Sequence, residues 1–153
     1  MSNRESIKRD ISAGYSLAEL VIVLGCVTLL LAAAVPNIVK LESEWTLLGS
    51  TRILEASLQW GRMQAIASNT PLMFMVDTVK QKFYWTDATS GECYAESVRH
   101  LPRGIGIVSS PRRPLRFYPH GNAAPAGTYT LAGDSGSYSV IVTPGGRIRT
   151  QRH

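Results

Sequence analysis

An uninterrupted apolar run near the N-terminus places the strongest limit on how this chain can fold. Residues 20–35 are 16 residues without a charge, and extension back to Tyr15 gives 21 at the cost of one Glu and one Ser. A helix needs roughly 20 such residues to cross the hydrocarbon core of a bilayer. The run therefore predicts a membrane-spanning helix over residues 15–35, with its polar N-terminal end at the interface.

The charges that flank this run predict its orientation. Arg4, Lys8 and Arg9 precede the run, whereas the positive charge of Lys40 beyond it is offset by two nearby carboxylates. Positively charged flanks stay in the cytoplasm. We therefore expect the N-terminus inside the cell and everything after Pro36 outside, in the periplasm.

Two kinds of N-terminal segment combine a basic stretch with an apolar run. An ordinary secretory signal peptide would be cut at the small residues 32–34 and release a soluble protein that begins at Val35. The second interpretation starts from residues 14–20, where Gly14 ends the basic stretch and Glu19 follows five residues later. A carboxylate at the edge of an apolar helix is costly unless it is paired, and a signal peptide has no use for one. The second interpretation is favoured.

Residues 14–36 resemble the leader and N-terminal helix of type IV prepilins and pseudopilins. The pattern of that family is a Gly, then usually Phe-Thr-Leu-Ile-Glu, then an apolar helix broken by a Pro. This chain departs from it at Tyr15, Ser16 and Ala18, and the first two keep the aromatic ring and the hydroxyl. The resemblance predicts that the apolar helix is retained as an anchor in the inner membrane.

The same resemblance implies roles for three residues. Residues 1–14 would be a cytoplasmic leader, cut after Gly14 by a prepilin peptidase that then methylates the new amine of Tyr15. Glu19 would neutralise the terminal amine of a neighbouring subunit in the assembled filament. Opposite charges in a low-dielectric bundle favour the register that pairs them.

A second helical segment is predicted over residues 36–68. Pro36 removes a backbone donor and predicts a kink at the membrane boundary. Asn69, Thr70 and Pro71 predict the end of the helix. Between them an apolar stripe recurs at three-to-four spacing and predicts a face for packing on a sheet. The residues of this stripe are Leu47, Thr51, Leu54, Leu58, Gly61 and Ala65.

Residues 69–153 change to short β-rich runs separated by Gly- and Pro-containing turns. Phe83 and Trp85 are expected on one face of the second run and Tyr84 on the other. The predicted class is therefore α+β, a long N-terminal helix packed on antiparallel sheet, as in type IV pilins. The expected strands are residues 72–76, 82–86, 105–109, 115–118, 128–131, 138–142 and 147–149.

The downstream part resembles the GspH/FimT family of minor pseudopilins and minor pilins. That resemblance implies a subunit that lies at the tip of a filament or helps to initiate its assembly, together with other pilins. It leaves open whether the filament belongs to a type IV pilus or to a type II secretion system. The segment from Asp87 to Arg99 matches no known pattern. The resemblance is carried by Arg62-Met63-Gln64-Ala65-Ile66, Leu101-Pro102-Arg103-Gly104-Ile105, Leu115-Arg116-Phe117-Tyr118-Pro119-His120-Gly121 and Gly146-Arg147-Ile148-Arg149.

Nothing in the residue pattern points to catalysis. The three His show no metal-ligand spacing, and His120 is expected in a solvated turn. Of the two Cys, Cys26 lies inside the apolar run and Cys93 has no His at a recognisable spacing. We expect no enzyme activity, no catalytic residue, no metal site and no cofactor.

The C-terminal part is strongly basic. Residues 99–153 hold eight Arg, no Lys and a single acid, a balance of +7, whereas residues 1–98 balance at −2. Arg147 and Arg149 alternate along the last predicted strand and should share a face, and Arg152 follows in a tail that can bend toward them. Three further Arg are expected in a surface loop with Pro111 and Pro114. These are Arg112, Arg113 and Arg116.

The arginines raise an alternative function, a receptor for double-stranded DNA in natural transformation. In the FimT-like branch of the family a Gly-Arg-x-Arg motif is implicated in DNA binding, and residues 146–149 match it. The planar guanidinium fork suits phosphate oxygens. Two other interpretations stay open, since these charges can form a solvated surface, and a similar Gly-Arg ending in GspH-like subunits can simply complete the last strand.

Overall fold

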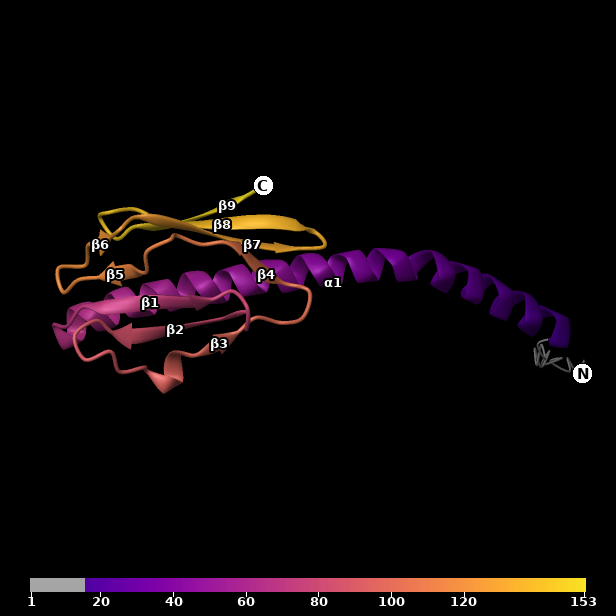
Figure 1. Cartoon of the computed structure of the whole chain (residues 1–153). Helices are drawn as coiled ribbons and strands as arrows, with labels where there is room; N and C mark the ends of the chain where they lie inside the picture. Colours follow the sequence, from indigo (N-terminus) through magenta and orange to yellow (C-terminus); the bar gives the residue numbers. More distant parts are fainter. Residues whose placement is uncertain (1–15) are drawn as a thin grey trace, which may run out of the picture. The chain divides into compact units, whose positions relative to one another are not determined.

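The computed structural model describes residues 16–153, apart from the side chains of residues 34–37 and 39. The chain divides into two compact units, residues 1–38 and residues 39–153. A single helix, α1 (Leu17–Ser68), contributes to both, and every strand belongs to the second unit (Figure 1). The sequence places a boundary at Pro36, and the helix is assigned without interruption at that residue.

In the described part of the first unit the apolar side chains form no core. Every described side chain from Leu17 to residue 33 is exposed, and Leu17 itself is 83% exposed. Among the described residues, no helix combines the length and the apolarity that a membrane span requires. The membrane-spanning helix over residues 15–35 remains a prediction.

The second half of α1 buries the stripe that the sequence predicts. Leu47, Thr51, Leu54, Leu58, Gly61 and Ala65 are all buried. The helix ends at Ser68, and Asn69 follows with a positive φ of 53°. Asparagine tolerates this left-handed conformation better than most residues, which suits it to a helix terminus.

Two antiparallel sheets pack on this half of the helix. Hydrogen-bonded neighbours in the first sheet follow the order β3-β2-β1-β5-β6, and in the second the order β4-β7-β8-β9 (Figure 1). The first sheet contains β1 (Leu72–Asp77), β2 (Lys82–Asp87), β3 (Arg99–His100), β5 (Leu115–Phe117) and β6 (Ala123–Ala124). The second contains β4 (Gly106–Ser109), β7 (Gly127–Gly133), β8 (Gly136–Val142) and β9 (Ile148–Arg152).

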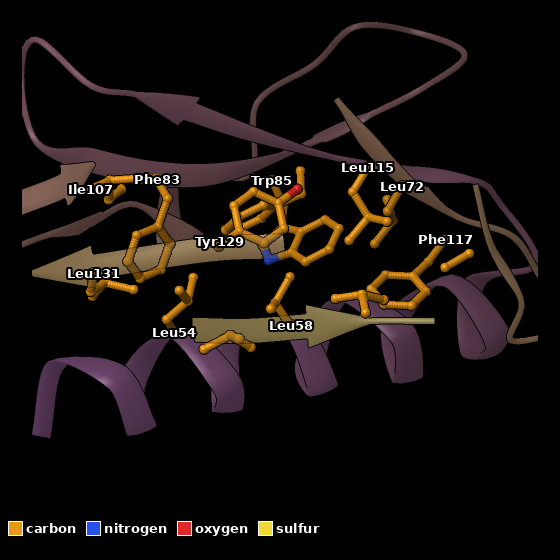
Figure 2. Close-up of a cluster of buried hydrophobic side chains, with 14 of the residues drawn as sticks. Leu54, Leu58, Leu72, Phe83, Trp85, Ile107, Leu115, Phe117, Tyr129 and Leu131 are labelled. Atoms are coloured by element: carbon orange, nitrogen blue, oxygen red, sulfur yellow. The ribbon is translucent and has the colours of Figure 1, made fainter. Parts of the chain in front are cut away.

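Aromatic side chains from both sheets meet over α1 in one core (Figure 2). The ring centroid of Phe74 lies 4.8 Å from that of Trp85 and 5.3 Å from that of Tyr129. Phe83 and Trp85 are fully buried while Tyr84 points to the other face, which confirms the predicted alternation. Burial raises the pKa of Tyr129, so its phenol stays protonated and serves as packing.

All seven predicted strands are present, with ends that coincide with the predicted ones or differ from them by at most three residues. The sequence missed β3 and β6, which are two residues each, and the short 3-10 turn η1 (Ala95–Ser97). The segment that matched no pattern begins with a turn in which the N–H groups of Ser90 and Thr89 donate to Asp87, lowering the pKa of that carboxyl. An isolated bridge between Thr86 and Cys93 then brings this segment back against β2.

Candidate functional site

The residues assigned to processing and assembly lie at the start of the chain. Gly14 and Tyr15 fall outside the described residues. Glu19 lies in the first turn of α1, and its side chain is exposed. A carboxylate in this position interacts favourably with the unpaired N–H groups of the helix N-terminus. Glu19 is therefore a negative charge that another molecule can reach.

The Gly-Arg-Ile-Arg segment spans the end of the β8–β9 turn and the start of β9. The N–H of Gly146 donates to the carbonyl of Thr143 at 2.9 Å, and the N–H of Thr143 donates to the carbonyl of Arg147 at 2.9 Å. Arg147 and Arg149 are both exposed. The prediction that Arg147 belongs to the strand is wrong by one residue, because pairing with β8 begins at Ile148.

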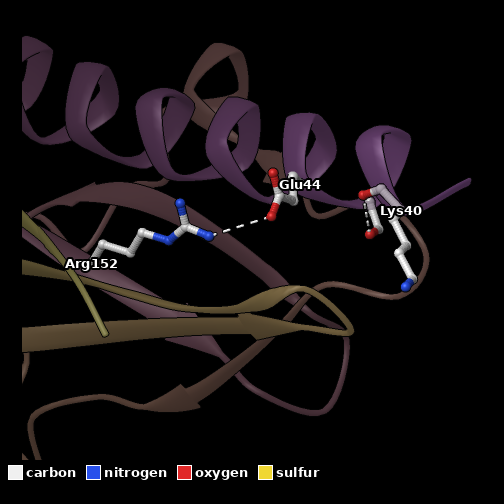
Figure 3. Close-up of polar contacts among 4 residues, drawn as sticks. Lys40, Glu44 and Arg152 are labelled. Carbon is white, nitrogen blue, oxygen red and sulfur yellow. Dashed lines mark hydrogen bonds and ion pairs between the residues drawn. The ribbon is translucent and has the colours of Figure 1, made fainter. Parts of the chain in front are cut away.

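Arg152 lies on the opposite face of β9 from Arg149. Thr150 donates through Oγ1 to Oε2 of Glu55 at 3.1 Å, and Nη2 of Arg152 pairs with Oε1 of Glu44 at 3.4 Å (Figure 3). These alternate residues face α1, which by the two-residue period turns Arg149 away from it. Arg152, which was expected in a flexible tail after the last strand, is thus the last residue of β9. With side chains 59% and 52% exposed, the ion pair of Arg152 and Glu44 contributes at most about 1 kcal/mol.

The remaining predicted arginines lie in and beside β5. Arg112 and Arg113 are exposed in the loop before the strand, as expected. Arg116 is within the strand itself, exposed between the buried Leu115 and Phe117, so it lies on the outer face of the five-stranded sheet. Arg113 and Arg116 line one open cavity of about 490 Å³.

One arginine without a predicted site role joins the helix to the loops of both sheets. Nε of Arg62 on α1 donates to the carbonyl of Gly121 at 2.9 Å. Gly146 packs on the same carbonyl so closely that a Cβ at Gly146 would overlap that oxygen. The N–H of Ala123 donates to the carbonyl of Pro144 at 2.9 Å, which adds a backbone bond between the same two segments. The sequence placed Arg62 only in a short motif at the helix end.

Positive charge dominates this part of the surface. Asp134 is the only acid among residues 99–153, against eight Arg. In the part of the chain that the structure describes, Arg152 with Glu44 is the single salt bridge. Because arginine is always protonated, the exposed guanidinium groups form a fixed positive field that attracts polyanions.

Other chemically active side chains are scattered. His120 is exposed in a turn, as expected, and Cys93 is an exposed free thiol. Within the described residues, no group of three or more His, Cys, Asp or Glu is placed to hold a metal ion. The chemistry that this surface concentrates is that of arginine, which binds carboxylate and phosphate oxygens.

Comparison with known proteins agrees with the fold. The solved structures that match with probability 1.00 include the type IV minor pilin FimU of Pseudomonas aeruginosa and the minor pseudopilin EpsH of the Type 2 Secretion System of Vibrio cholerae. FimU gives a TM-score of 0.58 at 18% identity over 69% of this chain and 87% of its own. EpsH gives 0.55 at 13% identity over 69% and 94%. The TM-scores show a shared fold, and at such low sequence identity the likeness shows the fold alone.

The family follows from the sequence match. The model of the family described as type II transport protein GspH matches residues 50–146, well over half of the 153 residues, and ends just before Arg147. Comparison with curated protein sequences gave no match. The match covers α1 from Ser50 to its end and all strands except β9. The chain therefore belongs to the GspH family and is a pilin-like protein of the minor pseudopilin and minor pilin class.

Proposed function

We propose that this chain is a minor subunit at the tip of a type II secretion pseudopilus or type IV pilus, where it helps to initiate assembly. The observation that carries the proposal is the exposed apolar surface of α1 over residues 17–33. An apolar surface of this extent requires lipid or other protein around it. A subunit held in the inner membrane by this helix and transferred into a filament with other pilins would have both in turn.

The second half of α1 supports assembly through the helix. Trp45, Ile53 and Met63 on this half of the helix are 64%, 51% and 62% exposed. In this proposal neighbouring subunits of the filament cover part of this apolar surface. In this proposal the N-terminus is cytoplasmic, a prepilin peptidase cleaves between Gly14 and Tyr15, and residues 39–153 lie in the periplasm.

Replacement of Glu19 by alanine tests the assembly role. An exposed carboxylate among apolar residues gains a partner when the helices bundle, and removal of one member of a buried charge pair is strongly unfavourable. We expect Glu19→Ala to reduce co-purification with partner pilins by at least about tenfold, which corresponds to the loss of roughly 1.4 kcal/mol or more. The measurement is quantitative pull-down of partner pilins from cells that express the complete assembly system.

Two controls accompany this prediction. Glu42→Ala removes another exposed carboxylate of α1 and should leave co-purification unchanged. Intact-mass measurement should find that wild type and both variants begin at Tyr15, which separates assembly from processing. Normal co-purification of Glu19→Ala would refute the pairing role, and a mature wild-type protein that begins at Val35 would refute the pilin anchor itself.

A second candidate function, a sequence-independent receptor for double-stranded DNA, is favoured by the exposed arginines. Arg147 and Arg149 are exposed and have no carboxylate partner among the described residues. Arg112, Arg113 and Arg116 add positive charge on and beside β5. Binding of this kind arises from phosphate contacts, which release counterions from the DNA. It weakens steeply as the salt concentration rises, because the free energy gained from that release falls.

The double change Arg147→Gln with Arg149→Gln tests this function. We expect the affinity of the full chain for duplex DNA at low salt to fall by about tenfold or more, because two phosphate contacts are lost. The measurement is fluorescence polarisation in non-ionic detergent at two salt concentrations. Arg52→Gln with Lys80→Gln removes the same charge from exposed sites elsewhere and should have a much smaller effect. Equal loss in the two double variants would mean that only net charge matters, and no binding by wild type would refute the receptor function.

A further inference from the structure

Arg147 shares a cavity with a second arginine that comes from the helix. The cavity has a volume of about 400 Å³ and lies between α1 and the β8–β9 turn. Neither Asp nor Glu contributes to its lining. The lining residues are Gln59, Arg62 and Met63 from the helix and Gly145, Gly146, Arg147 and Ile148 from the turn and strand.

The guanidinium of Arg62 is held in a fixed orientation at this cavity. Its Nε is occupied by the carbonyl of Gly121, while neither Nη group makes a hydrogen bond to any described residue. A Cβ built on Gly121 would lie 3.3 Å from Nη2 of Arg62, and one on Gly146 would lie 2.9 Å from Nε. Two glycines therefore make room for the guanidinium, and a group that is already held in place binds a ligand at a lower entropic cost.

Two arginines that line one cavity bring two positive charges near each other, and an anion bound there would offset their repulsion. Among the described residues, neither Arg62 nor Arg147 has a carboxylate partner. We propose that Arg62 and Arg147 together bind a backbone phosphate of DNA, with Arg62 as a second phosphate ligand from the helix. This inference rests on the proposed DNA-receptor function and assigns a site for it.

The surroundings of the cavity favour a chain of phosphates over a single carboxylate. A single carboxylate from a neighbouring subunit carries one negative charge, as one DNA phosphodiester does, and would leave the second positive charge at the cavity without a counterion. A nucleic-acid backbone supplies successive anions, and Arg149, two residues after Arg147, adds a further exposed positive charge for them. The guanidinium fork can present two parallel N–H groups to two oxygens of the same phosphate.

Arg62→Gln tests the site in the full chain, purified in non-ionic detergent and titrated with a fluorescent duplex. We expect about a fivefold loss of affinity at low salt and a less steep dependence of affinity on salt. Arg52→Gln, an exposed arginine of the same helix that lines none of these cavities, is the matched control and should change affinity by less than about twofold. Arg62→Lys, which keeps the charge without the fork, should lose about twofold to threefold and serves if the glutamine variant does not fold.

The Arg147→Gln background separates binding by Arg62 from mere support of the turn. If Arg62 contacts phosphate, Arg62→Gln should still weaken binding by about twofold or more in that background. No further loss there would reduce Arg62 to a positioning residue and overturn the inference. Folded Arg62 variants that bind DNA as tightly as wild type would also overturn the inference. If such variants instead lost binding to partner pilins, the ligand of the cavity would be a carboxylate of a neighbouring subunit. Absence of DNA binding by wild type would overturn the receptor function as well, whereas loss in the Arg147 and Arg149 variant alone would leave that function intact.

Discussion

Gly61→Ala is expected to lower the free energy of unfolding of the unit formed by residues 39–153 by about 3 kcal/mol. Intrinsic helix propensity alone predicts the opposite sign, a gain of about 1 kcal/mol for alanine. The tertiary contact decides the outcome, because a Cβ at Gly61 would overlap the six-membered ring of Trp85, which is completely buried.

The Trp85 ring cannot move aside to relieve this overlap. Its Nε1 donates to Oγ of Ser57 at 3.1 Å, and its centroid lies 4.8 Å from that of Phe74 and 5.8 Å from that of Phe117 (Figure 2). Displacement of the ring would break the hydrogen bond and disturb a core packed at the density of a crystal. The added methyl therefore strains the helix–sheet contact that organises the whole unit.

Urea denaturation of the full chain in detergent, followed by near-UV circular dichroism, measures the effect. Gly49→Ala is the matched control, because Gly49 belongs to the same helix and no heavy atom lies within 4 Å of the position that its Cβ would take. That variant should be as stable as wild type or more stable by about 0.5–1 kcal/mol. If both alanine variants proved stabilising, the close approach of α1 to β2 at Gly61 would be refuted.

Gly146→Ala is expected to destabilise the same unit by about 2–4 kcal/mol and to weaken any DNA binding through Arg147. Gly146 has a φ of 75°, a left-handed conformation that costs an alanine roughly 1–2 kcal/mol. The new Cβ would also overlap the carbonyl oxygen of Gly121, a backbone atom that cannot rotate away as a side chain would. The β8–β9 turn would then separate from Arg62 and shift Arg147.

Two further glycines divide this effect into its causes. Gly91→Ala carries the positive φ, 74°, in open space, and Gly145→Ala stands next to Gly146 without any heavy atom within 4 Å. The first should cost about 1–2 kcal/mol and the second under about 0.5 kcal/mol. A Gly146→Ala variant no less stable than Gly91→Ala would show that the contact with Gly121 contributes nothing.

This geometry gives the two parts of the Gly-Arg-x-Arg segment different tasks. Gly146 is required by the turn and by its contact with Gly121, whether or not the protein binds any ligand. Arg147 and Arg149 are exposed and make no comparable contact, so the fold does not account for them. One segment can therefore both complete the last strand and contact DNA. Only the variants of Arg147 and Arg149 test the contact with DNA.

The sequence by itself was sufficient wherever local periodicity governs burial. The stripe from Leu47 to Ala65 repeats at helical spacing, and all of its members are buried. Phe83 and Trp85 alternate with Tyr84, and the strand has the predicted inner and outer faces. These patterns can be recognised because each residue's environment follows from the geometry of its own element.

Only the tertiary structure decided which distant residues meet. The two-residue strands β3 and β6 are too short for a period and exist because β2 and β5 pair with them. Arg152 pairs with Glu44, 108 positions earlier in the chain, on the face of β9 opposite to that of Arg149. Arg62 joins Arg147 at one cavity because Gly121 and Gly146 leave space for its side chain. Such contacts depend on how helix and sheets pack, and a packing of elements far apart in sequence leaves no repeat in the order of the residues.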